Sequence, residues 1–474
     1  MNEPQVVPRI DGVTGPSTVE LAAGLLSAAG LDPGIASRLT VTGSDPYFPA
    51  IYRIGGAAAA AIGAASLGVT EVWRERTGRT QTVAIDTRHA IATYRSERWA
   101  QVEGLPPRGQ TDRLGLGFYR TADDRYIRYQ TSLPHHRQVA LDVLGCADDS
   151  AAGAEATRKR NAFEIEEAVC SRGGIAAVVL TNEEWAVHPH GSAVLRTPVV
   201  EITKIADSPP QPLRPAERPL SGVRVIDLTR VISGPTCCRF LAGHGADVIQ
   251  VTAPSVAPWG LMDIATGFGK RSAWLDLRTE PHTFGELVDQ ADVLVQGMRP
   301  GVLASHGFGP EAAAARRPGL IYVSLSGFGH QGPWSDRACY DSMLQCHNGM
   351  AYEGALYREG GQPAGLPCQV MDHSTAYIAA LGVLSALVRR AHEGGSYHVR
   401  VALATTGEWV KQMGRVDGAR IPDPELSEFE DLLTEMDTPY GPVRYMRPAE
   451  QLSETPPFYA LPTAPFGTHP PAWD

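Results

Sequence analysis

Residues Val370–Val401 read VMDHSTAYIAALGVLSALVRRAHEGGSYHVRV, a long apolar helix pattern followed by a short strand pattern. Because apolar residues occupy nearly every face, we predict a helix that is buried on nearly every face. Gly394-Gly395 are typical of a helix C-cap, and Asp372 stands where an N-cap belongs. This carboxylate therefore either only caps the helix or takes part in chemistry at the positive end of the helix dipole.

A second stretch, Arg53–Asp86, has the same layout: an apolar helix pattern that ends at Gly78 and then a strand pattern. Shifting one stretch by 316 positions places Gly78 on Gly394 and Gly56 on Asp372. We therefore predict a repeated helix–strand unit, of which only the second copy carries the carboxylate.

The composition is typical of a soluble globular protein with two or three domains: 474 residues, 43% of them hydrophobic and 20% charged. A net charge of −10 without a basic block argues against a nucleic-acid partner. The seven cysteines form no CxxC pair, which favours free thiols in a reducing compartment. We expect no metal site, because His188 and His190 have no further ligands at metal-binding spacing.

The sequence predicts neither a secretory leader nor a membrane span. The start, MNEPQVVPRIDG, lacks the basic-then-apolar pattern of a leader. The longest apolar run, Ile54–Val69, is shorter than a bilayer span. We therefore expect a cytoplasmic protein.

Alternating strand and helix patterns begin at Val223. The strand patterns are VRVIDL, ADVIQV, ADVLVQG and LIYVSLSGFG. Short Val/Ile/Leu runs separated by helices predict an α/β fold with a Rossmann-like parallel sheet, whose ligand would bind at the carboxyl ends of the strands. Neither G-x-G-x-x-G nor G-x-x-x-x-G-K-[ST] follows a strand, so we expect neither a dinucleotide site nor a P-loop.

Residues 98–217 predict a smaller α+β domain. Within it, GFYRTADDRYIRYQT has the pattern of a β-hairpin with Asp123-Asp124 in the turn. The stretch Asp207–Pro219 is rich in proline and predicts a linker. We divide the chain into an N-terminal segment with the copy that lacks the carboxylate (1–97), the small domain with its linker (98–217), and the Rossmann-like domain with the Asp372 helix and the C-terminal tail (218–474).

Five segments that begin at Pro219 carry a family resemblance. They are PLSGVRVIDLTRVISGPTCCRFLAGHGADVIQV, GKRSAWLDL, ADVLVQGMRPGVLASHGFGPE, RPGLIYVSLSGFGHQGP and CYDSMLQCHNGM. In this order they resemble successive motifs of the class III CoA-transferases, the CaiB/BaiF family, and the resemblance covers Pro219–Val401. It implies a fold of the CoA-transferase family III type. Ala57–Asp86 resembles the helix and strand that normally follow the family's catalytic aspartate, and residues 98–217 resemble its small domain. This order implies a permuted arrangement with a duplicated helix.

The resemblance maps the family's catalytic aspartate onto Asp372. An ionised carboxylate is already a nucleophile, and we expect the helix dipole to keep Asp372 ionised at pH 7. It would attack an acyl-CoA thioester to give an aspartyl-acyl anhydride and CoA thiolate, which would return to form an aspartyl-CoA thioester. A carboxylic acid would then receive the CoA. The implied partners are acyl-CoA and a carboxylic acid, with CoA as substrate, no prosthetic group, and an interlocked homodimer as the assembly.

The resemblance also implies CoA contacts in three loops and beside the Asp372 helix. Arg and Lys suit the phosphates of CoA. Because Gly297-Met298 replace an Asn-Phe pair that is usual in the family, we expect rearranged phosphate contacts. The residues mapped as CoA contacts are Thr229, Arg230, Val231, Lys270, Arg271, Gly297, Met298, Arg299, Tyr340 and Asp341.

Two other functions stay open at this point. In the racemase branch of the family, a histidine occupies the position of Tyr340 and is one of two proton-transfer groups. Tyrosine, with a reference pKa of about 10, is a poor replacement, which favours a transferase over an alpha-methylacyl-CoA racemase or isomerase. The third interpretation is a CoA-binding protein without turnover, since the order of the segments is permuted and Gln250 replaces a usual basic residue.

Overall fold

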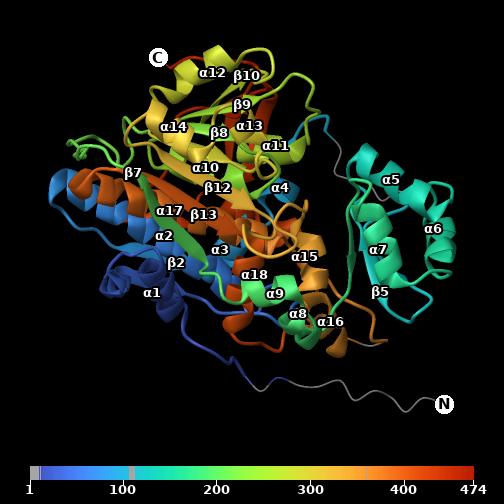
Figure 1. The fold of residues 1–474 in the computed structure, drawn as a ribbon. Helices are drawn as coiled ribbons and strands as arrows, with labels where there is room; N and C mark the ends of the chain where they lie inside the picture. The colour runs from blue at the N-terminus through green and yellow to red at the C-terminus, as the bar shows by residue number, and fades with distance from the viewer. Residues whose placement is uncertain (1–9, 11, 106–112, 359, 474) are drawn as a thin grey trace.

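A seven-stranded sheet forms the centre of the structure (Figure 1). The computed structural model describes residue 10 and residues 12–105, 113–358 and 360–473. The first six strands are parallel, and the last is antiparallel to its neighbour, which confirms the predicted α/β fold with a parallel sheet. In spatial order the strands are β10 (Lys270–Trp274), β9 (Asp247–Thr252), β8 (Arg224–Leu228), β11 (Val293–Gln296), β12 (Ile321–Ser326), β13 (Ser396–Ala402) and β7 (Val200–Ala206).

The direction of strand addition reverses beside β8. From β8 the chain passes through α10 (Ser233–Gly243) to β9 and β10 on one side of the sheet. It then crosses to β11, β12 and β13 on the other side. The carboxyl ends of β8 and β11 therefore frame a crevice, which is where ligands bind in open α/β sheets.

Helices cover both faces of this sheet. On one face α17 (Val370–Glu393) and α10 pack against alternate strand residues such as Val323 and Val399. On the other face α12 (Pro281–Val288) and α14 (Pro310–Arg316) pack against residues such as Leu294. The predicted buried helix and its following strand are thus confirmed as α17 and β13, and the helix ends at Gly394 with φ +63°.

α2 (Ile54–Thr77) lies beside α17 (Figure 1), and both helices are 24 residues long. Their bounds differ by 316 positions at both ends (370 − 54 and 393 − 77). The strands that follow them pair differently, because β2 (Val83–Asp86) lies in a separate sheet between β1 (Leu39–Thr42) and β16 (Glu450–Leu452). The helix bounds agree with the predicted repeat, and duplication itself stays a prediction.

By length and composition, α2 and α17 could each cross a membrane. Their most apolar windows are 100% and 94% buried inside the protein, respectively. Such burial is that of core helices, and it follows from their packing against each other and against the sheet.

A small unit stands apart from the main body, at the right of Figure 1. The predicted hairpin is confirmed in it, with β4 antiparallel to β5 and Asp124 in the turn at φ +59°. Its elements are β4 (Phe118–Arg120), β5 (Tyr126–Tyr129), β6 (Ala176–Val178), α5 (Pro134–Leu144), α6 (Ser150–Thr157) and α7 (Ala162–Cys170). β7, which we assigned to the same predicted domain, instead pairs with β13. Hydrogen bonds therefore cross the predicted boundary, and the three-domain division stays a prediction.

The remaining elements connect these units. A capping box of Ser17 and Glu20 starts α1 (Thr18–Ala28). A third small sheet holds β14 (Leu433–Thr438), β15 (Gly441–Met446) and β3 (Gln101–Val102). The other helices are α3 (Thr87–Thr93), α4 (Ser96–Trp99), α8 (Asn182–Val187), α9 (Pro189–Val194), α11 (Leu261–Thr266), α13 (Val302–Ser305), α15 (Asp341–His347), α16 (Met350–Leu356) and α18 (Leu403–Gln412), with 3-10 turns at Pro33–Arg38 and Leu426–Leu432.

Candidate active site

A cavity of about 400 Å³ lies at the carboxyl ends of β8, β11 and β12, where the order of strands reverses. This is the volume and the place expected for a small-molecule site in an open α/β sheet. The residues predicted from the sequence that line it are Asp372, Thr229, Arg230, Val231, Gly297, Met298, Arg299 and Tyr340. The other three predicted residues, Lys270, Arg271 and Asp341, do not line this cavity.

We had predicted Asp372 at the N-cap of α17, but it is the third residue of the helix. Gln369 occupies the N-cap position, and its side chain makes no capping hydrogen bond. The capping carboxylate comes from Asp341, which accepts hydrogen bonds from the N–H groups of Met371 at 2.8 Å and Asp372 at 3.1 Å. Since Asp341 satisfies these donors, the Asp372 side chain is left to face the cavity.

The N-terminus of α2 has the same arrangement without the second carboxylate. There Asp45 accepts hydrogen bonds from the N–H groups of Gly55 and Gly56, both at 2.7 Å. A shift of 316 positions places Gly56 on Asp372, so each helix is capped by an acidic residue from elsewhere in the chain. A helix of this kind therefore begins without an aspartate at the position of Asp372.

The carboxyl group of Asp372 is nearly enclosed, with 8% of the residue exposed. Its Oδ1 accepts a hydrogen bond of 2.5 Å from the hydroxyl of Ser233, at the start of α10. The pKa of Asp372 is raised to about 8, first by burial and then by the charge of Asp341, although the Ser233 hydroxyl lowers it. The raised pKa runs against our expectation of an ionised Asp372 at pH 7, because burial and the charge of Asp341 favour the neutral form.

Asp341 is the member of this pair that is held by several hydrogen bonds. Burial raises the pKa of Asp341 as well, and hydrogen bonds from Gln345, Asp372 and Met371 offset only part of this rise. The Gln345 amide donates to the second carboxylate oxygen at 2.5 Å. Asp341 is thus a fully bonded structural carboxylate, and its position does not support the predicted contact with CoA.

The loop after β8 has an unusual backbone. Val231 has φ +72°, a region that β-branched residues rarely adopt. Thr229 donates to the Asp227 carboxylate through both its hydroxyl and its N–H. A Cβ at Gly234 would lie 2.2 Å from the Thr229 side chain, so only glycine allows α10 to approach this loop so closely. The hydrogen bonds to Asp227 and the close packing of α10 at Gly234 together hold this strained loop in the wall of the cavity.

The structure does not bring Lys270 and Arg271 to the cavity. The Lys270 ammonium is buried and pairs with Asp227 at 2.8 Å, and it also donates to the Pro235 carbonyl. Arg271 makes a double hydrogen bond to Asp247 and a further one to the Ala472 carbonyl. Both cations form ion pairs and hydrogen bonds within the protein, so their positions do not support the predicted phosphate contacts.

The small unit contributes His136, from α5, which the sequence did not single out. Its ring stands edge-on to Tyr340, with the centroids 6.3 Å apart, and it lines the cavity. The residue is 5% exposed, and its Nδ1 has no hydrogen-bond partner among the described residues. Burial, His135 and Arg299 lower the pKa of His136 to about 4, so its imidazole is neutral at pH 7.

Two arginines give the cavity a positive wall. Arg230 donates to the Ala257 carbonyl at 2.5 Å, while Arg299 is exposed and forms no ion pair within the described ranges. Arg337, a third cation of the lining, pairs with Glu167 at 3.1 Å. Ser233 and Arg337 were also missed from the sequence, because only the fold brings these segments to Asp372.

Next to Asp372 in α17, His373 makes a buried contact with the N-terminal segment. His373 Nε2 lies 3.3 Å from Glu97, and the His373 ring stacks on Tyr94 at 4.8 Å. Burial alone would raise the pKa of Glu97, but its hydrogen bond to His373 and the His373 charge lower it overall. The charged Glu97 also contributes to the raised pKa of Asp372.

Comparison with known proteins identifies the class of this region. Residues 220–418 match the family described as CoA-transferase family III. The match includes every residue predicted as a site from the sequence.

Individual relatives are named as CoA-transferases. The chain is 31% identical to "Acetyl-coenzyme A transferase nodX" of Hypoxylon pulicicidum, over 57% of this chain and 48% of the relative. It is 37% identical to "Formyl-CoA:oxalate CoA-transferase" of Bradyrhizobium sp. (strain ORS 278), over 39% of this chain and 46% of the relative. The chain thus spans about half the length of the curated relatives it matches.

Solved structures give partial matches. A CaiB/BaiF family protein from Brucella suis is 33% identical, with a TM-score of 0.36 over 40% of this chain and 55% of that chain. Rv3272 from Mycobacterium tuberculosis is 30% identical, with a TM-score of 0.38 over 41% of this chain and 58% of that chain.

Proposed function

We propose that this protein is a CoA-transferase that moves CoA from an acyl-CoA to a carboxylic acid through Asp372. The observation that carries the proposal is the division of roles at α17, in which Asp341 caps the helix and Asp372 faces the cavity. The helix does not need the Asp372 carboxylate as a cap, and burial of this group raises its pKa. A buried carboxylate with a raised pKa in a cavity is typical of a catalytic group.

The proposed reaction uses the residues that line the cavity. Deprotonated Asp372 attacks the thioester carbonyl, forming an aspartyl-acyl anhydride and releasing CoA thiolate, which returns to the aspartyl carbonyl and displaces the donor acid. The acceptor carboxylate attacks this aspartyl-CoA thioester, and CoA thiolate then takes the acceptor acyl group and restores Asp372. Arg230 and Arg299 suit the phosphates of CoA, and the Ser233 hydroxyl steadies the Asp372 oxygen.

Trapping of the intermediates tests this proposal. The protein is incubated with an acyl-CoA and then with hydroxylamine or borohydride, and the peptide that contains Asp372 is analysed by mass spectrometry. We expect a hydroxamate or an alcohol at Asp372 that is missing from the Asp372→Asn variant. An unmodified Asp372 across a broad panel of acyl-CoA donors that bind would favour a CoA-binding protein without turnover.

A second candidate is an acyl-CoA racemase or isomerase, which His136 favours. Its neutral imidazole stands beside Tyr340, near the position that a histidine occupies in the racemase branch. A proton transfer at the α-carbon would then use His136 and Asp372. Solvent deuterium that enters the α-carbon without an acceptor acid would support this candidate over the transferase.

The assembly and the location are part of the proposal. We propose a homodimer, as the family resemblance implies, and a cytoplasmic protein whose thiols are reduced, consistent with seven free cysteines. Sedimentation equilibrium tests the first point, with twice the mass of 50.8 kDa as the expected result.

A further inference from the structure

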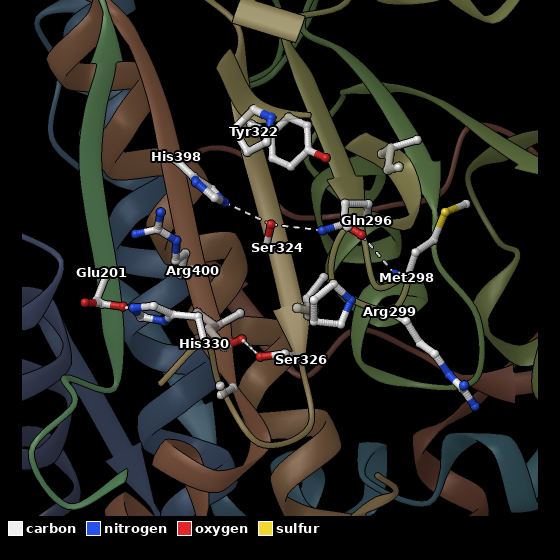
Figure 2. Close-up of a pocket in the computed structure, with 18 of the residues that line it drawn as sticks. Glu201, Gln296, Met298, Arg299, Tyr322, Ser324, Ser326, His330, His398 and Arg400 are labelled. Atoms are coloured by element: carbon white, nitrogen blue, oxygen red, sulfur yellow. Dashed lines mark hydrogen bonds and ion pairs between the residues drawn. The ribbon is translucent and has the colours of Figure 1, made fainter. Parts of the chain in front are cut away.

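A second pocket, of about 200 Å³, opens on the sheet face turned away from α17 (Figure 2). On β13 alternate residues such as Val399 and Val401 belong to the core with α17, whereas His398 and Arg400 point to the opposite face. On that face the amino halves of the strands are apolar and covered by helices, but the carboxyl halves are polar. The polar residues of the parallel strands that line the pocket are Gln296, Ser324, Ser326, His398 and Arg400.

A hydrogen-bonded chain fixes the orientation of three of these side chains (Figure 2). The Met298 N–H donates to Gln296 Oε1 at 2.9 Å, so the Gln296 amide turns its Nε2 toward Ser324, to which it donates at 2.9 Å. Ser324 Oγ then lies 2.9 Å from His398 Nε2. With the Ser324 hydroxyl donating to Nε2, neutral His398 carries its proton on Nδ1, which is buried and has no acceptor among the described residues.

Arg400 is a cation without an acidic partner inside the described part of the chain. Its cross-strand neighbour on β7 is Glu201, but the Glu201 carboxylate pairs with His330 Nδ1 at 3.3 Å instead. With histidines counted as neutral, the lining carries two positive charges, Arg299 and Arg400, against the single negative charge of Glu201. A half-buried guanidinium on an inner strand, with an excess of positive charge around it, favours an anion.

The other walls of the pocket are apolar. Met298, Leu303 and Pro310 line it, and Tyr322 lies at its inner end. The volume is below the range of drug-sized ligands, so the pocket suits a short molecule that has one charged and one apolar end.

We propose that this pocket binds a small monocarboxylic acid, with its carboxylate on Arg400 and its short chain against Met298 and Leu303. The site is separate from Asp372, but the two share the loop after β11, since Met298 and Arg299 line both cavities. The proposal does not depend on the transferase function, because it concerns binding on the opposite face of the sheet.

Butyrate is the probe for this site. Saturation-transfer NMR titrations compare butyrate with butyramide, which has the same shape without the charge. We expect saturable butyrate binding, at least about tenfold tighter than that of butyramide, since a charge-assisted pair to arginine is lost with the charge. Equal binding of the two ligands, or butyrate binding that does not saturate, overturns the proposal with no variant needed.

Three variants then locate the butyrate. Arg400→Gln is expected to weaken butyrate at least about tenfold. Arg444→Gln, the same change on a half-buried strand residue that lines neither cavity, is expected to leave the affinity within about twofold. Asp372→Asn is expected to abolish CoA transfer and to keep butyrate binding. The transfer assay therefore tests the proposed function, and the butyrate titration separately tests this inference. Binding lost in Asp372→Asn and kept in Arg400→Gln would place the acid in the Asp372 cavity and refute the inference.

Discussion

Asp341 binds the N–H group of Asp372 at 3.1 Å, so the charge that caps α17 lies directly beside the proposed nucleophile. The same carboxylate binds the N–H of Met371 at 2.8 Å and accepts from Gln345 on its other oxygen. Asp341 therefore frees Asp372 from capping and at the same time raises its pKa, in addition to the larger effect of burial. The first role favours catalysis, because it leaves Asp372 facing the cavity, whereas the second opposes catalysis, because it disfavours the nucleophilic carboxylate. The two roles can be separated by experiment.

The first prediction concerns Asp341→Asn. The amide oxygen can still accept from both N–H groups, but the negative charge beside Asp372 is gone, so the pKa of Asp372 falls below about 8. We expect the acidic limb of kcat/KM against pH to move down by about one unit, because only deprotonated Asp372 is a nucleophile. Asp437→Asn, on exposed β14, should leave the limb in place. An unchanged limb in Asp341→Asn would show that the limb belongs to another group.

The second prediction is a pH-dependent stabilisation in Asp372→Asn. The folded chain holds the Asp372 proton up to about pH 8, whereas the unfolded chain loses it near the ordinary value of 3.8. Between these values the folded state binds more protons, so the free energy of unfolding of the natural protein falls as pH rises, an effect that asparagine cannot show. We expect equal melting temperatures for the two proteins near pH 4, and a variant that melts roughly 2–4 °C higher at pH 8.5. A constant difference across this pH range would contradict the raised pKa.

The sequence predicted the sheet because its strands are short Val/Ile/Leu runs with local patterns. The family resemblance implied CoA contacts in the loops after β8 and β11, and the parallel strands separately predicted a ligand at their carboxyl ends. It misplaced Asp372 by assuming a local cap, because the capping group, Asp341, lies 31 positions earlier and reaches the helix only through the fold. The local pattern alone could not separate a cap from a nucleophile.

Two further residues show where sequence patterns stop being informative. Lys270 has a charge that suits a phosphate, but its partner, Asp227, is 43 positions away in the sequence. The two residues meet only because β10 and β8 belong to the same sheet. His136 belongs to the small unit, and its place in the cavity depends on how that unit sits against the main body. Both outcomes depend on tertiary contacts and not on local spacing.

The third prediction concerns the Ser233 hydroxyl. Its hydrogen bond to Asp372 lowers the pKa of that carboxyl, so Ser233→Ala raises the pKa above about 8. We expect kcat/KM at pH 7 to fall roughly tenfold, and the loss to shrink as the pH approaches 10, where Asp372 is ionised in both proteins. Ser385→Ala is the matched control, because that buried hydroxyl donates to the Ala29 carbonyl, far from the cavity. A loss in Ser233→Ala that is the same at every pH would assign Ser233 to substrate binding.

The fourth prediction separates Lys270 from Arg299, two cations that were mapped alike from the sequence. Lys270→Met leaves the Asp227 charge unpaired in the core, so we expect a loss of ~3–5 kcal/mol in the free energy of unfolding and little change in KM for acyl-CoA. Adding Asp227→Asn should restore much of this stability, since the unpaired charge is removed.

Arg299→Gln should do the reverse. Arg299 is exposed and lines the cavity, so its loss removes a charge-assisted contact to a phosphate and raises KM for acyl-CoA roughly tenfold, while the melting temperature changes by about 1 °C or less. Chemical denaturation and steady-state kinetics measure the two effects on the same preparations. If Lys270→Met instead raises KM at unchanged stability, the buried pair of Lys270 and Asp227 must open when CoA binds. The predicted contact between Lys270 and CoA would then be supported.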